Sequence, residues 1–151
     1  MPPRPQPKDK PAAAARFLAV QALYQMEISG HAPKDVAREF EDYWRHARFA
    51  EYELPPHSAA LLREIIDGVA AEQAELDARL NALLKTDWEI ARLDSILRAL
   101  LRAAAWELLH RAPPKPQQVV AAYTDMAHAF CETRLAGMAN AVLDRLAKAS
   151  A

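Results

Sequence analysis

Glycine and cysteine are scarce in this chain, and their scarcity excludes several kinds of site. Among 151 residues there are three glycines and one cysteine. Because Gly30, Gly68 and Gly137 lie far apart, they do not form the glycine-rich loop that holds a phosphate. A single cysteine, Cys131, excludes an internal disulfide, and no cysteine and histidine cluster has the spacing of a zinc site. We expect no metal, no cofactor and a reducing compartment.

Long hydrophobic runs and a strong net charge are also missing. No stretch approaches the roughly 18 uninterrupted apolar residues of a membrane span. The proline-rich first ten residues lack the apolar core of a signal peptide. The sequence therefore predicts a cytoplasmic protein without membrane contact. The net charge of −1 neither indicates nor excludes a nucleic-acid partner, so only the distribution of charge is informative.

No catalytic constellation stands out in the sequence. His128 and Cys131 are three residues apart and come closest to a thiol and base pair, but helix packing explains them better. A solvated helix face explains the acidic residues Glu72, Glu75 and Asp77 better than a pair of catalytic carboxylates does. We therefore expect a binding protein with no catalytic residues, not an enzyme.

Alanine and leucine dominate what is present, and they favour helices over sheets. Residues 1–11 contain five prolines and no apolar periodicity, which predicts a disordered basic tail. Beyond it, residues 12–149 are expected to form one all-α domain of about six helices. Apolar residues recur at helical spacing over approximately 12–29, 34–49, 57–85, 93–110, 119–130 and 135–146.

Two of the predicted helices carry more specific expectations. In the second helix, Val36, Phe40, Tyr43 and Trp44 are expected to point inward. The fourth helix, 93–110, has the broadest apolar face of the chain. A helix with so broad an apolar face is normally central and packed by several neighbours.

Single-stranded RNA is usually held by cations on its phosphates and by planar side chains that stack on its bases. Arg16 adjoins the basic tail, and Tyr24 follows two helical turns later. Arg98 and Arg102 are one turn apart, so they are expected to project side by side as a basic edge. The alternatives remain open: the two arginines as solubilising charges, and Tyr24 as a core residue.

Four short motifs, taken in order, resemble one family. They are VQALYQ at 20–25, Trp88 with RLD at 92–94, LRAAAWEL at 101–108 and NAVLDRL at 140–146. Each motif is weak alone, but their shared order and separations over about 15–147 resemble the NusB family of transcription antitermination factors.

The resemblance implies two packed helical subdomains and a defined set of partners. It implies binding to the boxA sequence of nascent RNA together with the ribosomal protein NusE, on ribosomal RNA operons. RNA polymerase elongation complexes with other Nus factors would be the wider assembly, and a homodimer is left open. By position, the resemblance matches Arg16, Tyr24, Arg102, Asn140 and Asp144 to family residues. Together with the charge pattern, it gives Lys8, Lys10, Arg16 and Arg134 as candidate RNA contacts and Tyr24, Arg98 and Arg102 as candidate partner contacts.

The chain also departs from the family pattern. Residues 12–15 are alanines where the family usually has several arginines, so fewer phosphate contacts are expected. Arg134 occupies a position that is often acidic, which predicts an added contact. Two alternatives follow: a protein-binding helical adaptor with little RNA affinity, or a stand-alone equivalent of the helical domain of ribosomal RNA cytosine methyltransferases. The second predicts a downstream cofactor-binding domain.

Overall fold

The computed structural model describes residues 10–46, 48–49, 52–53, 59–84, 88–111 and 114–149. Its elements, in chain order, are α1 (Lys10–Ser29), α2 (Pro33–His46), β1 (Arg48–Phe49), β2 (Tyr52–Glu53), α3 (Ala59–Leu83), the 3₁₀ helix η2 (Ile90–Arg92), α4 (Ser95–His110), α5 (Pro116–Phe130) and α6 (Thr133–Ala149). The predicted all-α fold class is confirmed.

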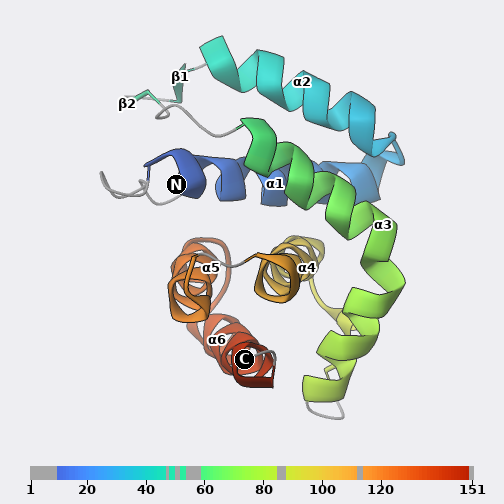
Figure 1. Cartoon of the computed structure of the whole chain (residues 1–151), viewed down its shortest axis with the longest axis vertical. Coiled ribbons are helices and arrows are strands. Elements are labelled where there is room, and N and C mark those ends of the chain that lie inside the picture. The colour runs from blue at the N-terminus through green and yellow to red at the C-terminus, as the bar shows by residue number, and fades with distance from the viewer. Residues whose placement is uncertain are drawn as a thin grey trace.

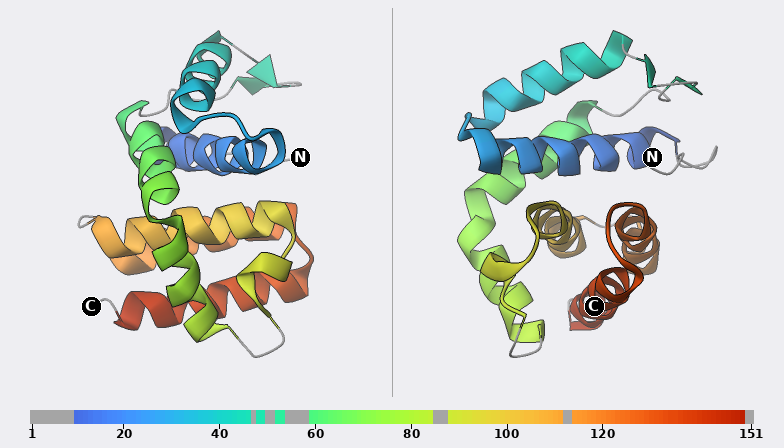
Figure 2. Two further views of the ribbon diagram at one scale, coloured as in Figure 1. Left: turned by 90° about the vertical axis from the view of Figure 1, so that its right-hand side faces the viewer. Right: turned by 180° about the vertical axis from the view of Figure 1, so that it is seen from behind.

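The helices form two packed subdomains joined by α3 (Figure 1). The first contains α1, α2 and the start of α3, and the second contains α4, α5 and α6. Helix α3 leaves the first subdomain and runs down the side of the second, as Figure 2 shows from two further directions. Within the described residues, no helix has both the length and the apolar character needed to cross a membrane.

Helix α1 begins slightly earlier than its apolar pattern predicts. It starts at Lys10, two residues before the predicted domain boundary, while residues 1–9 of the predicted tail lie outside the described part of the chain. Its end agrees with the sequence: Gly30 has a φ of 76°, and its N–H donates to the Met26 carbonyl at 2.8 Å. Glycine favours this left-handed cap because it has no Cβ.

Helix α2 is shorter than predicted. It ends at His46, and Arg48 and Phe49 pair with β2 as antiparallel strand residues instead of extending the helix to 49. Apolar periodicity locates a helix but fixes its ends poorly. Val36 is buried as expected. The predicted inward side chains of Phe40, Tyr43 and Trp44 lie outside the described residues.

Helix α3 bends in its middle. Glu72 has non-helical dihedral angles, φ −119° and ψ 19°, and one turn earlier Gly68 faces the indole ring of Trp106 on α4. A Cβ on Gly68 would lie 2.0 Å from the Trp106 Nε1 atom, so glycine permits the close approach of α3 to α4. The bend lies where α3 passes from one subdomain to the other.

Helix α4 is central, as its apolar face predicts. Asp94 caps its start by accepting a hydrogen bond from the Ile96 N–H at 3.0 Å. The helix packs against α1, α3, α5 and α6. Small buried residues allow these neighbours to approach closely: Ala99, Ala103, Ala104 and Ala105.

Candidate nucleic-acid interface

Arg16, predicted to contact RNA, lies in the protein core. Its Nε and Nη2 atoms donate to the two carboxylate oxygens of Glu107 at 2.8 and 3.0 Å. The Arg16 side chain is 7% exposed and that of Glu107 is fully buried. A guanidinium held in this way is directed at a carboxylate and shielded from solvent. The placement therefore gives Arg16 a structural role and lends no support to the predicted phosphate contact.

Two more side chains complete this buried cluster around Glu107. Arg111 donates to Glu107 Oε1 at 2.6 Å, and the Tyr123 hydroxyl on α5 donates to Oε2. The Arg16 guanidinium also lies over the Tyr123 ring, with its carbon 5.9 Å from the ring centroid. Burial and the nearby Glu107 charge raise the pKa of Tyr123 well above its ordinary value, so its hydroxyl remains a donor.

Glu107 could have been found from the sequence. The predicted helix 93–110 contains two acidic residues, Asp94 at its start and Glu107 in its interior, and the other buried residues of α4 are apolar. An acidic residue in such a position must be paired when it is buried, because an isolated charge is costly to desolvate. The pattern indicates a partner but does not identify it, since Arg16 lies 91 residues away in the sequence.

Arg98, predicted to contact the partner protein, holds three segments together. Its side chain is paired with Glu27 of α1 at 2.6 Å. Its Nη1 atom also donates to backbone carbonyls around η2, at 2.6 Å to Leu93 and 3.2 Å to Ala91. These bonds satisfy carbonyls at the end of a short helix and fix the segment before α4. Arg98 thus fixes the positions of α1, η2 and α4, and it adds little positive charge to the surface because Glu27 neutralises it.

Arg102 makes the corresponding link between α4 and α3. Its Nε and Nη2 atoms donate to the two Asp77 oxygens, both at 2.8 Å. The side chains of Arg98 and Arg102 are each 11% exposed. The predicted basic edge is therefore wrong, because both guanidinium groups are neutralised and largely covered. Asp77, expected on a solvated face, is likewise half-buried in this pair.

A shallow groove lies beside Arg102, where the end of α1 meets α3 and α4. We call it the α1–α3–α4 groove; its volume is about 290 Å³ and it is lined by Leu23, Met26, Glu27, Gly30, His31, Val69, Ala70, Gln73, Ala99 and Arg102. Tyr24, on the same stretch of α1, is half-buried and packs against the core. Both expectations for Tyr24 are thus compatible with its place: part of the ring is core, and part remains accessible.

Arg134 differs from the other predicted RNA ligands that are described, because it is exposed. It lies in the first turn of α6, and its guanidinium carbon is 5.2 Å from the centroid of the half-buried Trp88 ring. The starts of α1 and α6 lie on the same side of the molecule, one in each subdomain (Figure 2, left). Lys10 begins α1, and only its backbone is described, while Lys8 lies outside the described residues.

The residues once considered for catalysis do not form a reactive site. Burial, with a smaller effect of Asp94, raises the pKa of the Cys131 thiol, which disfavours the reactive thiolate. Glu72 instead contacts His110, with 3.0 Å between its carboxylate and the imidazole Nε2 atom. No group of three potential metal ligands is found in the described ranges.

Fold and surface together define an all-α binding protein of two helical subdomains, with an exposed cation at one end and a groove where three helices meet. The fold matches the crystal structure of antitermination factors NusB and NusE in complex with dsRNA, with a TM-score of 0.75, 20% identity and coverage of 91% of this chain and 96% of the other. It also matches NusB of T. maritima, with a TM-score of 0.74, 22% identity and 91% coverage of both chains.

Sequence comparison identifies the family. The NusB family profile matches residues 13–148, and the chain belongs to the NusB family. The transcription antitermination protein NusB of Nitrobacter hamburgensis is 46% identical over 135 residues, covering 89% of this chain and 84% of the relative. NusB of Rhodopseudomonas palustris strain TIE-1 is 43% identical over 148 residues, covering 98% and 85%. Family membership places the chain among antitermination factors, which are not enzymes.

Proposed function

We propose that this chain is an RNA-binding transcription antitermination factor that pairs with ribosomal protein NusE on boxA RNA. It acts in the cytoplasm on elongating RNA polymerase with other Nus factors, and it supports transcription of ribosomal RNA operons. Family membership supports the role, since the relatives carry the antitermination name. A structure with the same fold contains NusE and RNA.

The RNA surface in this proposal lies on the side of the molecule where α1 and α6 begin (Figure 2, left). The exposed Arg134 above Trp88 is the observation that carries it. A cation–π contact with the indole ring leaves the N–H groups of the exposed guanidinium for phosphate oxygens. Lys8 and Lys10 add charge from the start of the chain. Arg16 is not included, because its guanidinium binds Glu107.

The partner surface in this proposal is the α1–α3–α4 groove with the accessible part of Tyr24. The groove is lined by apolar and polar side chains together, and aromatic rings beside such a surface are common anchors in protein interfaces. Arg98 and Arg102 contribute by fixing α1, α3 and α4 around the groove through Glu27 and Asp77. NusE is the occupant to which the proposal commits.

Fluorescence anisotropy with a labelled boxA RNA, with and without NusE, tests the function. We expect weak binding by the chain alone and tighter binding with NusE. Arg134→Ala should weaken RNA binding and lower the salt slope by about 0.7, the value for one contact with a single strand. Lys148→Ala, an exposed cation paired with Asp144 near the end of α6, is the matched control. Absence of binding in both conditions at low salt would overturn the proposal.

A protein-binding adaptor with little RNA affinity is the second candidate. The observation that favours it is the alanine run: Ala14 and Ala15 are buried in α1, at positions where the family usually has arginines. NusE binding without any gain in RNA affinity would support this candidate. No observation favours the methyltransferase-domain alternative.

A further inference from the structure

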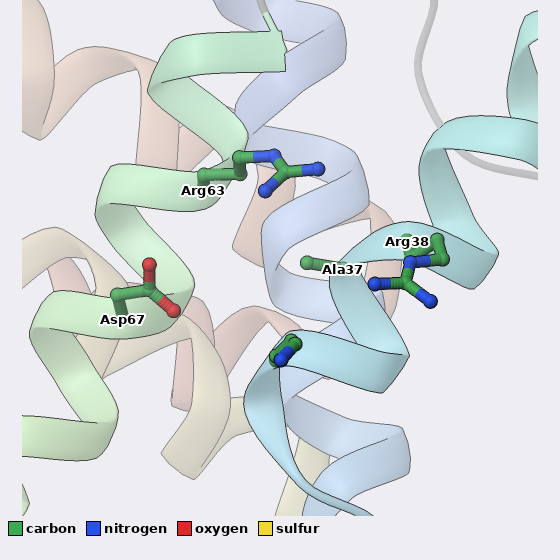
Figure 3. A pocket seen from close by; sticks show the side chains of 5 residues that line it. Ala37, Arg38, Arg63 and Asp67 are labelled. Atoms are coloured by element: carbon green, nitrogen blue, oxygen red, sulfur yellow. The ribbon is translucent and has the colours of Figure 1, made fainter.

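A second cationic surface lies in the first subdomain, between α2 and α3. It is a groove of about 250 Å³ lined by Lys34, Ala37, Arg38, Arg63 and Asp67, which we call the α2–α3 groove. Figure 3 shows Arg63 and Asp67 on one wall and Arg38 on the other, with Ala37 between them. The α2 wall therefore carries two cations, Lys34 and Arg38, and the α3 wall carries Arg63 and Asp67.

The helix registers explain why these charges gather. Lys34 and Arg38 are one turn apart on α2, so they share a helix face, and Arg63 and Asp67 share a face of α3 in the same way. The acidic neighbours Asp35 and Glu39 occupy adjacent positions that do not line the groove. Lys34 and Arg38 are exposed, and neither has an ion-pair partner among the residues that the structure describes.

The mixed charge of the groove suits a nucleotide better than a bare anion or an acidic peptide. Ammonium and guanidinium groups bind phosphate oxygens. The Asp67 carboxylate repels a second carboxylate, but it can accept a hydrogen bond from a ribose 2′-hydroxyl. An RNA strand supplies both chemical groups on every nucleotide, whereas an acidic peptide supplies neither phosphate nor ribose.

The position of the groove determines which part of an RNA could reach it. Helix α2 begins just after α1 ends, so Lys34 and Arg38 lie at the far end of α1 from Lys10 (Figure 1). At 1.5 Å per residue, the length of α1 separates the two ends by about 30 Å. Nucleotides bound at the α1 and α6 starts cannot occupy the groove as well. A longer RNA must follow the subdomain to reach it.

We propose that the α2–α3 groove binds the sugar–phosphate backbone of RNA flanking the boxA segment. Lys34 and Arg38 contact phosphates, and Asp67 accepts from a ribose hydroxyl. The inference rests on the proposed function, because it extends the RNA path of the same protein. The groove would add a contact that only a longer RNA can make and that does not depend on the base sequence.

The test compares two RNAs bound by the full chain with NusE. One is a short boxA RNA, and the other carries about ten extra nucleotides on each side, a length chosen to cover the roughly 30 Å of α1. Lys34→Glu/Arg38→Glu should weaken binding of the extended RNA about tenfold and lower its salt slope by about 1.4, the sum for two single-strand contacts. Binding of the short RNA should stay within about twofold.

The matched control is Arg79→Glu/Lys148→Glu, which changes the net charge equally at two exposed cations outside the groove. It should leave the preference for the extended RNA unchanged. Replacing the flanking riboses by deoxyriboses should weaken binding to the parent chain, and Asp67→Ala should remove that difference. The comparison of ribose with deoxyribose distinguishes a site in which Asp67 contacts the 2′-hydroxyl from nonspecific attraction of RNA to positive charge.

Several results would overturn the inference while leaving the proposed function intact. They are an unchanged affinity of Lys34→Glu/Arg38→Glu for the extended RNA, an equal loss with the short RNA, and an equal loss in the control variant. A defect in NusE binding alone would assign the groove to protein and not to RNA. If the parent chain binds no boxA RNA, the proposed function itself fails and the inference fails with it.

Discussion

Arg16 on α1 and Glu107 on α4 form a two-point ion pair inside the protein, with donor–acceptor distances of 2.8 and 3.0 Å. The same carboxylate accepts from Arg111 and from Tyr123 on α5. One buried charge thereby joins three helices, and its partners come from both subdomains. The pair explains why an arginine in the first helix is compatible with the core.

Removing the central carboxylate should destabilise the fold strongly. Glu107→Ala leaves Arg16 buried without this counter-charge, and loss of one partner of a buried pair costs about 3–5 kcal/mol. Urea unfolding followed by circular dichroism gives the free energy of unfolding. Glu75→Ala, which removes an exposed partner of Arg79, is the control and should change it by less than about 0.5 kcal/mol. Equal losses in the two variants would contradict a special role for Glu107.

Gly68→Ala should destabilise the contact between α3 and α4. The new Cβ would lie 2.0 Å from Trp106 Nε1, so the indole must move, and such overpacking costs about 1–3 kcal/mol. Gly137→Ala on α6 is the matched control, because no atom lies within 4 Å of its Cβ position. It should stabilise the protein by about 0.5–1 kcal/mol through helix propensity. An increase in stability in both variants would show that the Trp106 indole can move aside without destabilising the protein.

Alkaline pH should weaken the fold through Tyr123. Its folded pKa is raised well above 10.0, whereas the unfolded chain releases the proton near the ordinary value. Its contribution is therefore fully present below about pH 10 and declines above it, by about 1.4 kcal/mol per pH unit for one proton. Urea unfolding between pH 8 and 11 should show this fall. In Tyr123→Phe the decline should be shallower by one proton, and parallel curves would refute the assignment.

The partner surface can be tested by filling the α1–α3–α4 groove. Ala70 is exposed and lines the groove, so Ala70→Trp should block docking and weaken NusE binding about tenfold or more. Ala78→Trp places the same ring on α3 at an exposed position outside the groove and should bind NusE normally. Isothermal titration calorimetry measures both affinities. Normal binding by Ala70→Trp would remove the groove from the proposed interface.

The fold could be predicted largely from the sequence because the helices are determined by residues close together in the chain. Apolar residues at helical spacing, the glycine at Gly30 and the prolines between segments locate the six helices to within a few residues. The broad apolar face of 93–110 also predicts the central helix. The last residue of α2 could not be predicted, because strand pairing at Arg48 and Phe49 depends on their partners Glu53 and Tyr52.

The candidate site could be predicted less well because charge pairing depends on distant parts of the chain. A sequence shows that Arg98 and Arg102 share a helix face, but it does not show Glu27 and Asp77 beside them. The sequence predicts Arg16, Arg98 and Arg102 to be surface cations. In the structure each forms a largely buried ion pair with an acidic residue of another helix. Among the residues that the structure describes, Arg134 contacts the Trp88 ring and no acidic side chain, so its RNA assignment stays a prediction that the geometry supports.

The packing of α4 against α1 limits how far the two subdomains can move relative to each other. The ion pairs Arg16–Glu107 and Glu27–Arg98 join α1 to α4 and cross the boundary between the two subdomains. Bending at that boundary would break several buried bonds together. We therefore expect α1 and α4 to move as one body, which would hold the ligands of the two subdomains at a constant separation.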